Sequence, residues 1–157
     1  IKKLLSYVPQ NNRETTPKVP YVLGNEVREK LDVIVPDNAN KPYDMHDVIS
    51  NIIDEDSFFE IHAAFAENII VGFARLGGRS IGIVANNPKY LAGCLDVKSS
   101  IKAARFVRFC DCFNIPLLVL EDVPGFCQEQ IKNGTELLRT ELNYCTHLVK
   151  QQFQELP

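Results

Sequence analysis

The stretch NIIVGFARLGGRSIGIVAN, residues 68–86, decides the fold of this chain. It contains two β-rich runs, residues 68–76 and 79–86, joined by Gly77-Gly78. Because glycine tolerates positive φ, this pattern predicts an antiparallel hairpin closed by a tight primed turn. Gly72 and Gly82 fall inside the predicted strands and indicate places where another backbone approaches closely.

A helix and a buried strand are predicted after the hairpin. We expect Ser99 or Ser100 to cap the helix, which should run to about Phe113. The run LLVL, residues 117–120, is wholly apolar, as expected of a central parallel strand covered on both faces. Strands followed by a helix and a buried strand form a βαβ pattern, which places the chain in the α/β class.

The predicted helix has one polar stripe. Lys102, Arg105, Arg108 and Asp111 recur every three residues and should face water. The remaining positions are mostly apolar, so we expect the helix to be buried on most sides. These positions are Ile101, Ala103, Ala104, Phe106, Val107, Phe109, Cys110 and Phe113.

Upstream of the hairpin the chain is irregular and rich in proline. Residues 1–43 are therefore predicted to be a linker, with residues 1–7 as the end of a preceding helix, and residues 44–157 form the partial domain. Asp44 should cap a short helix, and FFEIH, residues 58–62, should form a short strand. A last helix is predicted over residues 129–152.

Composition narrows the function classes. The chain has 157 residues, a net charge of -3 and a pI near 5.6, which argue for one domain and against a nucleic-acid partner. No apolar run is long enough to cross a bilayer, so no membrane association is expected. Five cysteines without framework spacing suggest free thiols, and no metal site is expected. Because the chain starts at Ile1, we expect a fragment or a processed product.

Collinear segments over residues 4–126 resemble the carboxyltransferase family of propionyl-CoA, methylmalonyl-CoA and glutaconyl-CoA enzymes. The order and spacing of these segments are far more specific than a short motif. They are LLSYVP (4–9) with NNRE (11–14), IVPD (34–37), KPYDM (41–45), NIIVGFAR (68–75) with GIVAN (82–86), AGCLDV (92–97), KAARFVRFCD (102–111), FNIPL (113–117) and DVPGF (122–126).

The resemblance implies a crotonase-like fold of ββα units, here an incomplete second half of a carboxyltransferase β subunit. Such enzymes move CO2 between carboxybiotin and an acyl-CoA, and backbone N–H groups hold the developing oxyanions. The implied partners are a biotin carboxylase or biotin carrier subunit, which carries the biotin, and other copies of the carboxyltransferase subunit in a hexamer. The implied location is the mitochondrial matrix in a eukaryote or the cytoplasm in a bacterium.

The candidate site lies just after the predicted buried strand, because ligands bind at the carboxyl ends of strands in open α/β sheets. The resemblance implies that the N–H groups of Gly125 and Phe126 face the biotin pocket and act in catalysis; the alternative is a turn glycine and a core phenylalanine. Pro124 and Asp122 are assigned to cofactor binding. Pro124 would stiffen the turn, and Asp122 would line the pocket or cap the next helix.

The chain departs from the family after Phe126. The family continues with Leu-Pro-Gly-Thr, whereas this chain has CQEQ at residues 127–130, and the family's Gly-Gly-Ala-Tyr-Asp segment does not occur. We therefore expect the chain to be inactive alone. One alternative is a non-catalytic remnant that acts as a subunit-interaction protein. Another is a stand-alone crotonase-type hydratase, but the paired glutamates for acid–base catalysis are lacking.

For the other polar residues we weigh a functional role against an ordinary structural one. The arginines flanking the turn, and the basic residues of the predicted helix, either attract phosphates or are ordinary exposed side chains. The histidines have no partner at a telling spacing, and the cysteine after the DVPGF segment has no neighbouring base to lower its pKa. These residues are Arg75, Arg79, Lys102, Arg105, Arg108, His46, His62, His147 and Cys127.

Overall fold

A four-stranded mixed sheet forms the centre of the computed structural model, which describes residues 1–21, 31–36, 38 and 41–123. β2 (Ile69–Leu76) pairs antiparallel with both β1 (Phe59–Glu60) and β3 (Arg79–Asn86). β3 then pairs parallel with β4 (Leu117–Leu120). The described part of the chain therefore has the predicted α/β character, and its sheet order is β1-β2-β3-β4.

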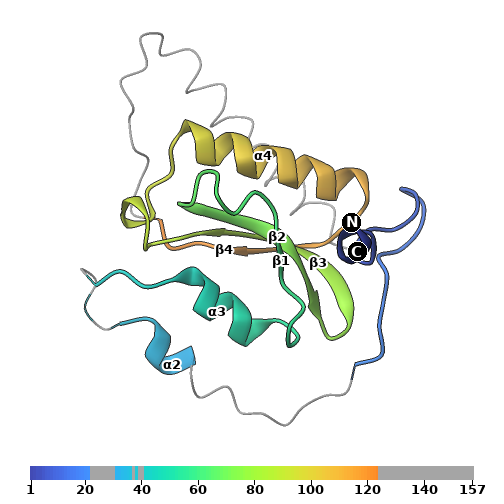
Figure 1. Cartoon of the computed structure of the whole chain (residues 1–157), viewed down its shortest axis with the longest axis horizontal. Coiled ribbons are helices and arrows are strands. Elements are labelled where there is room, and N and C mark those ends of the chain that lie inside the picture. Colours follow the sequence, from blue (N-terminus) through green and yellow to red (C-terminus); the bar gives the residue numbers. More distant parts are fainter. Residues whose placement is uncertain (22–30, 37, 39–40, 124–157) are drawn as a thin grey trace, which may run out of the picture.

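Helices lie on both faces of this sheet. α4 (Val97–Cys112) covers one face, and α3 (Met45–Ile52) lies on the other (Figure 1). α1 (Lys2–Leu5) and α2 (Leu31–Ile34) are single turns, and a short 3₁₀ turn, Leu91–Gly93, precedes α4. Asp44 caps α3 by accepting from the N–H of His46, as the sequence predicts.

The hairpin prediction is confirmed. Gly77 and Gly78 have φ of +59° and +76°, the two positive values that a primed turn requires. The carboxylate of Asp54 accepts hydrogen bonds from both glycine N–H groups, at 2.9 and 2.7 Å. A side chain from the segment before β1 therefore holds the turn in place.

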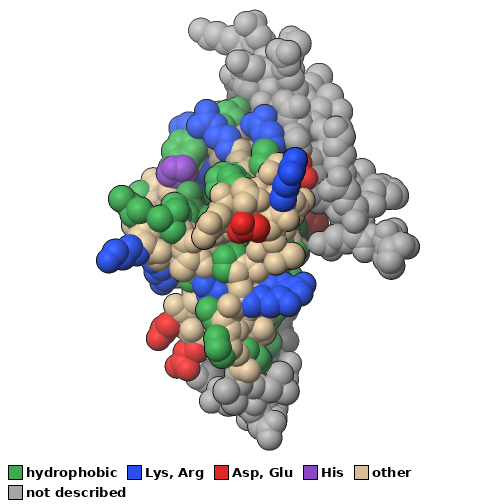
Figure 2. All heavy atoms as spheres, turned by 90° about the vertical axis from the view of Figure 1, so that its right-hand side faces the viewer, with side chains coloured by type: hydrophobic (Ala, Val, Ile, Leu, Met, Phe, Trp, Pro, Cys, Tyr) green, Lys and Arg blue, Asp and Glu red, His purple; other side chains and the backbone are tan. Residues whose placement is uncertain are grey.

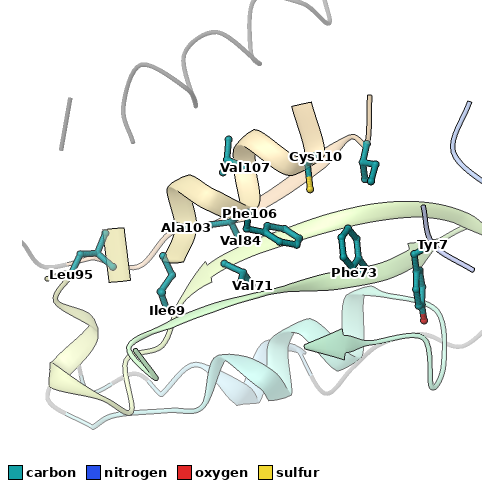
Figure 3. Packing of buried hydrophobic residues seen from close by; sticks show 11 residues of the cluster. Tyr7, Ile69, Val71, Phe73, Val84, Leu95, Ala103, Phe106, Val107 and Cys110 are labelled. Atoms are coloured by element: carbon teal, nitrogen blue, oxygen red, sulfur yellow. The ribbon is translucent and has the colours of Figure 1, made fainter. Parts of the chain in front are cut away.

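The strands of the hairpin are apolar on both faces, and each face has its own core. Ile69, Val71 and Phe73 of β2 point toward α4, whereas Ile70 and Ala74 point toward α3. This alternation follows from the two-residue period of a strand. Figure 3 shows the α4 side, where Phe73 lies between the rings of Phe106 and Tyr7, at centroid distances of 5.0 and 6.1 Å.

The two strand glycines meet different neighbours. A Cβ on Gly72 would lie 2.6 Å from the carbonyl oxygen of Phe59, so backbone approaches closely there, as predicted. A Cβ on Gly82 would instead meet the side chains of Leu117 and Cys110, at 2.7 and 2.8 Å. The prediction is therefore wrong for Gly82, because side chains from β4 and α4 occupy the space.

The start of α4 differs from the prediction. Asp96, not Ser99 or Ser100, is the N-cap residue. Its side chain accepts from the N–H of Ser99, whose hydroxyl accepts from the N–H of Asp96, so the two residues form a capping box. The helix begins three or four residues earlier than expected.

The predicted polar stripe of α4 is also partly wrong. Arg105, Arg108 and Asp111 are exposed, but Lys102 is only 4% exposed. Its ammonium donates to the carbonyl oxygens of Ala66 and Ile69, at 3.3 and 2.8 Å. Two positions predicted to be buried are exposed instead, namely Ile101 and Phe109.

β4 is parallel to its neighbour, as predicted, but it is the outermost strand among the described residues and Val119 is exposed. The predicted strand at residues 58–62 is shorter, because only Phe59–Glu60 pair and His62 has a positive φ of 54°. The predicted helix at residues 129–152 lies outside the described residues.

The proline-rich N-terminal segment packs against the sheet. Tyr7 is buried in the α4-side core, and its hydroxyl donates to the carbonyl of Ser57. The guanidinium of Arg75 lies 4.9 Å from the Tyr7 ring centroid and donates to the carbonyl of Ser6 at 2.8 Å. Arg75 therefore fastens this segment to β2. The division of the chain at residue 43 stays a prediction.

Candidate functional site

Polar side chains meet at the carboxyl ends of β3 and β4. Because these strands are parallel, Asn86, the last residue of β3, and Asp122, two residues beyond β4, lie at the same edge of the sheet. We call Tyr43, Asn86, Asn87 and Asp122 the strand-end rim. Ligands bind at this edge in open α/β sheets.

Asn86 holds the backbone of Asp122. The Asn86 Nδ2 donates to the carbonyl of Asp122, and its Oδ1 accepts from the Asp122 N–H at 2.7 Å. Asn86 is buried, and both the nitrogen and the oxygen of its side-chain amide have a hydrogen-bond partner in the protein. The residue that follows β4 is thus fixed in place by a side chain of β3.

Tyr43 contacts the side chain of Asp122. Its hydroxyl donates to Oδ2 of Asp122 at 2.8 Å. Burial, the hydrogen bond to Asp122 and the charge of Asp122 raise the pKa of Tyr43 to about 12. The hydroxyl therefore stays protonated at neutral pH and acts as a donor. No described residue donates to the other carboxylate oxygen, Oδ1.

Asn87 joins the rim to the start of α3. This side chain is fully buried, and its Oδ1 accepts from the N–H groups of Met45 and Lys89, at 3.3 and 3.2 Å. Its Nδ2 donates to Oδ1 of Asp44 at 3.2 Å. Asp44 in turn accepts from the ammonium of Lys89 at 3.0 Å.

His46 lies between two carboxylates beside the rim. Its Nδ1 is 2.6 Å from Asp44 and its Nε2 is 3.0 Å from Glu60. Burial alone would lower the pKa of His46, but the hydrogen bonds to Asp44 and Glu60 outweigh it and raise that pKa. Burial pushes the pKa of Asp44 upward, yet the bonds from His46 and Lys89 hold it well below its usual range. We call Asp44, His46, Glu60 and Lys89 the His46 cluster.

This arrangement suits recognition of a polar ligand. The rim offers a carboxylate oxygen as an acceptor, and its amide and hydroxyl groups are already committed to holding that carboxylate. Among the described residues no group of three or more His, Cys, Asp and Glu side chains is placed to hold a metal ion. In the same residues, no helix has the length and apolar character to span a membrane.

Of the four predicted site residues, one lies among the residues that the structure describes. Asp122 lies at the rim, with its side chain bonded to Tyr43. The other three, Pro124, Gly125 and Phe126, lie outside the described residues, and their roles stay predictions. Cys127 and His147 lie outside them as well.

Arg75 and Lys102 make contacts that the sequence did not predict. Arg75 is an internal tether rather than an exposed hairpin arginine or a phosphate ligand. Lys102 borders an apolar groove of about 580 Å³ between α4, β2 and α1. Phe65, Phe106 and Phe109 line the same groove.

Sequence reasoning missed Tyr43, the two asparagines and the partners of His46. One signal was available, because Asn86 ends a predicted strand and Asn87 follows it, just as Asp122 comes shortly after the next predicted strand. No comparable signal exists for Tyr43 or Glu60, which are brought to the site by tertiary packing.

Comparison with known proteins identifies the family. The carboxyl transferase domain matches residues 1–143. The chain belongs to the carboxyl transferase family. The crotonase-like α/β fold expected from the sequence is thereby confirmed, and a crystal structure of transcarboxylase 12S superimposes on this carboxyl transferase chain with a TM-score of 0.90 at 43% identity.

Relatives are much longer than this carboxyl transferase chain. The carboxyltransferase subunit of propionyl-CoA carboxylase from Haloferax mediterranei is 53% identical over 146 residues, which cover 88% of the chain and 28% of that protein. A biotin-dependent acetyl-/propionyl-coenzyme A carboxylase beta5 subunit from Mycobacterium tuberculosis is 53% identical over 154 residues, with the same coverage of 88% and 28%. The transcarboxylase match covers 96% of the chain and 29% of that structure, which is a hexamer assembly with methylmalonyl-CoA bound.

Proposed function

We propose that this chain is part of a carboxyltransferase subunit that moves CO2 between carboxybiotin and an acyl-CoA of the propionyl-CoA type. The observation that carries the proposal is the family match over residues 1–143, at 53% identity to a propionyl-CoA carboxylase subunit. Since the chain spans 28% of that relative, it is expected to need further segments for activity.

The strand-end rim supports a role in holding biotin. The ureido group of biotin carries an N–H donor, and Asp122 has a carboxylate oxygen, Oδ1, to which no described residue donates. The Asp122 carboxylate can therefore accept a hydrogen bond from the ureido N–H, with Tyr43 and Asn86 orienting Asp122. When carboxylated, biotin supplies an activated CO2.

The loop after Asp122 would complete the site. We assign the N–H groups of Gly125 and Phe126 to the biotin pocket, where they would stabilise negative charge that develops on an oxygen atom. Pro124 would limit the conformations of the turn that presents them.

The proposed partners follow from the reaction. Biotin would arrive on a biotin carboxylase or biotin carrier subunit, and other copies of the carboxyltransferase subunit would complete the assembly. The acyl-CoA would be the small-molecule substrate. The proposed location is the mitochondrial matrix in a eukaryote or the cytoplasm in a bacterium.

A second candidate is a non-catalytic remnant that retains the subunit-contact surface. The observation that favours it is the sequence after Phe126, where CQEQ stands at residues 127–130 in place of the Leu-Pro-Gly-Thr that the family resemblance implies.

A chimera separates the two candidates. Residues 4–143, which include CQEQ, would replace the matching segment of the Haloferax mediterranei subunit, and transfer of labelled CO2 from carboxybiotin to propionyl-CoA would be measured. We expect activity in the chimera and none in the 157-residue chain alone. Asp122→Asn in the chimera should lower kcat/KM for carboxybiotin, whereas exposed Asp111→Asn on α4 should not. A chimera that assembles but transfers no CO2 would support the remnant.

A further inference from the structure

A second hollow, of about 470 Å³, lies at the opposite edge of the sheet from the strand-end rim. Arg79, which lines it, is the first residue of β3, and Pro116 directly precedes β4. Arg13, Lys18 and Arg79 line this hollow together with Thr15, Thr16 and Asn114. Lys and Arg side chains are prominent on the side of the molecule that carries the N-terminal segment (Figure 2).

The three cations around the hollow have no acidic partner among the described residues. The ion pairs that the described residues form lie elsewhere: His46 pairs with Asp44 and Glu60, and Lys89 pairs with Asp44. Glu14, the acidic residue of the lining, accepts a hydrogen bond from the side chain of Asn11 at 2.8 Å.

Two of the cations are held directly opposite one another. Lys18 pairs with Arg79 in an antiparallel bridge, and residues directly opposite in such a pair have their Cβ atoms about 4.5–5.5 Å apart. Like-charged pairs of this kind destabilise a sheet unless something compensates their charge. Both residues of this pair line the polar hollow, so an anion bound there would offset their repulsion.

The backbone that carries these cations is firmly attached. The N–H of Val19 donates to the carbonyl of Gly78 at 2.9 Å, and the N–H of Ser80 donates to the carbonyl of Pro17 at 3.3 Å. On the other side, Nδ2 of Asn114 donates to the carbonyl of Asn12 at 2.8 Å. The basic groups are therefore gathered before a ligand arrives, which lowers the entropic cost of binding.

We propose that this hollow binds the phosphate or diphosphate group of a small-molecule ligand. Guanidinium groups bind phosphate oxygens through paired, charge-assisted hydrogen bonds, and an ammonium adds a point charge. The hydroxyls of Thr15 and Thr16 and the amide of Asn114 supply neutral donors. This site is separate from the strand-end rim and does not depend on carboxyl transfer.

Binding of inorganic pyrophosphate to the full chain tests the proposal by calorimetry at low ionic strength. Lys18→Gln with Arg79→Gln should weaken binding about tenfold or more, because charge-assisted bonds are lost. The control is Lys98→Gln with Arg108→Gln, which removes the same net charge from exposed positions of α4 and should leave the affinity unchanged.

Two results would overturn the proposal: no pyrophosphate binding to the unaltered chain, or equal loss in the test and control variants. Arg13→Gln is a second variant, outside the bridge, in case the double variant misfolds. Pyrophosphate should raise the melting temperature of the unaltered chain and raise it less in Arg13→Gln. An equal rise in both would also contradict the proposed site.

Discussion

Asn86 hydrogen-bonds through its side chain to both the N–H and the C=O of Asp122, so one buried residue of β3 holds the residue that emerges from β4. The amide of Asn86 acts here as a further peptide group of the sheet. It continues the β3–β4 pairing past the last strand residue, Leu120. The position of the Asp122 carboxylate therefore depends on two strands and not on its own loop alone.

Asn86→Ala should destabilise the chain by about 2 to 3 kcal/mol, because two hydrogen bonds are lost and the Asp122 peptide is left unsatisfied in a partly buried place. The free energy of urea unfolding measures this loss. Asn11→Ala is the matched control, since Asn11 also makes two side-chain hydrogen bonds but is exposed. It should cost less than about 1 kcal/mol. Equal costs would show that the Asn86 bonds contribute nothing special.

The His46 cluster should make stability depend on pH. The folded pKa of His46 is raised above the unfolded value near 6.5, so its contribution is complete below pH 6.5 and is lost as pH rises through the folded pKa. The expected size is about 0 to 1 kcal/mol, because the imidazole is more than a third exposed. Unfolding free energies of the unaltered chain and His46→Gln should converge as pH rises through that range. A constant difference would contradict the raised pKa.

The stability that Asp44 contributes depends on pH in the opposite sense to that of His46. Its folded pKa lies below the unfolded value near 3.8, so its contribution is present above that pH and is lost as pH falls. Asp44→Asn should therefore cost most at neutral pH, and its cost should shrink below pH 3.8 in urea unfolding. The cluster contributes most between the two unfolded values, where the carboxylate is charged and the imidazole is protonated. A cost that does not change with acidification would contradict this account.

The hairpin could be predicted because its determinants are local. Gly77-Gly78 selects the turn, and the apolar runs beside it are long enough to fill both faces of a strand. The cap of α4 was missed because Ser99 stands at N3 of a capping box, three residues after the N-cap residue Asp96. Family membership was also predictable, since the carboxyltransferase segments are collinear over most of the chain.

The polar stripe on α4 was predicted wrongly for a geometric reason. A repeat of three residues falls behind the helical period of 3.6 by about 60° at each step. From Lys102 to Asp111 the direction therefore turns by about half a circle, so the two residues cannot share one face. No sequence pattern links Tyr43 with Asp122, because 79 positions separate them and only the tertiary fold brings them together.

Lys102→Ala should cost about 2 to 4 kcal/mol of stability, although lysine is ordinarily a surface residue. The substitution removes a buried stem and the hydrogen bonds to the carbonyls of Ala66 and Ile69. Arg108→Ala on the same helix removes an exposed side chain and should cost less than about 0.5 kcal/mol. Chemical denaturation compares the two variants. Similar costs would mean that Lys102 faces water, as a simple polar stripe requires.

The two turn glycines should respond differently to alanine. Both have positive φ, which costs an alanine about 1 kcal/mol at either position. A Cβ on Gly77 would meet nothing within 4 Å, so Gly77→Ala should cost only that amount. A Cβ on Gly78 would lie 2.2 Å from the carbonyl oxygen of Val19, so Gly78→Ala must displace the N-terminal segment.

This displacement should raise the cost of Gly78→Ala above about 2 kcal/mol, because the Val19–Gly78 hydrogen bond and the neighbouring Lys18–Arg79 bridge are lost as well. Urea unfolding gives the cost, and proteolysis at Lys18 reports the displacement, which Gly77→Ala should not cause. Gly78→Ala should also weaken pyrophosphate binding, since the bridge carries two of the three cations of the proposed hollow. Equal effects of the two substitutions would show that the N-terminal segment does not pack on the turn.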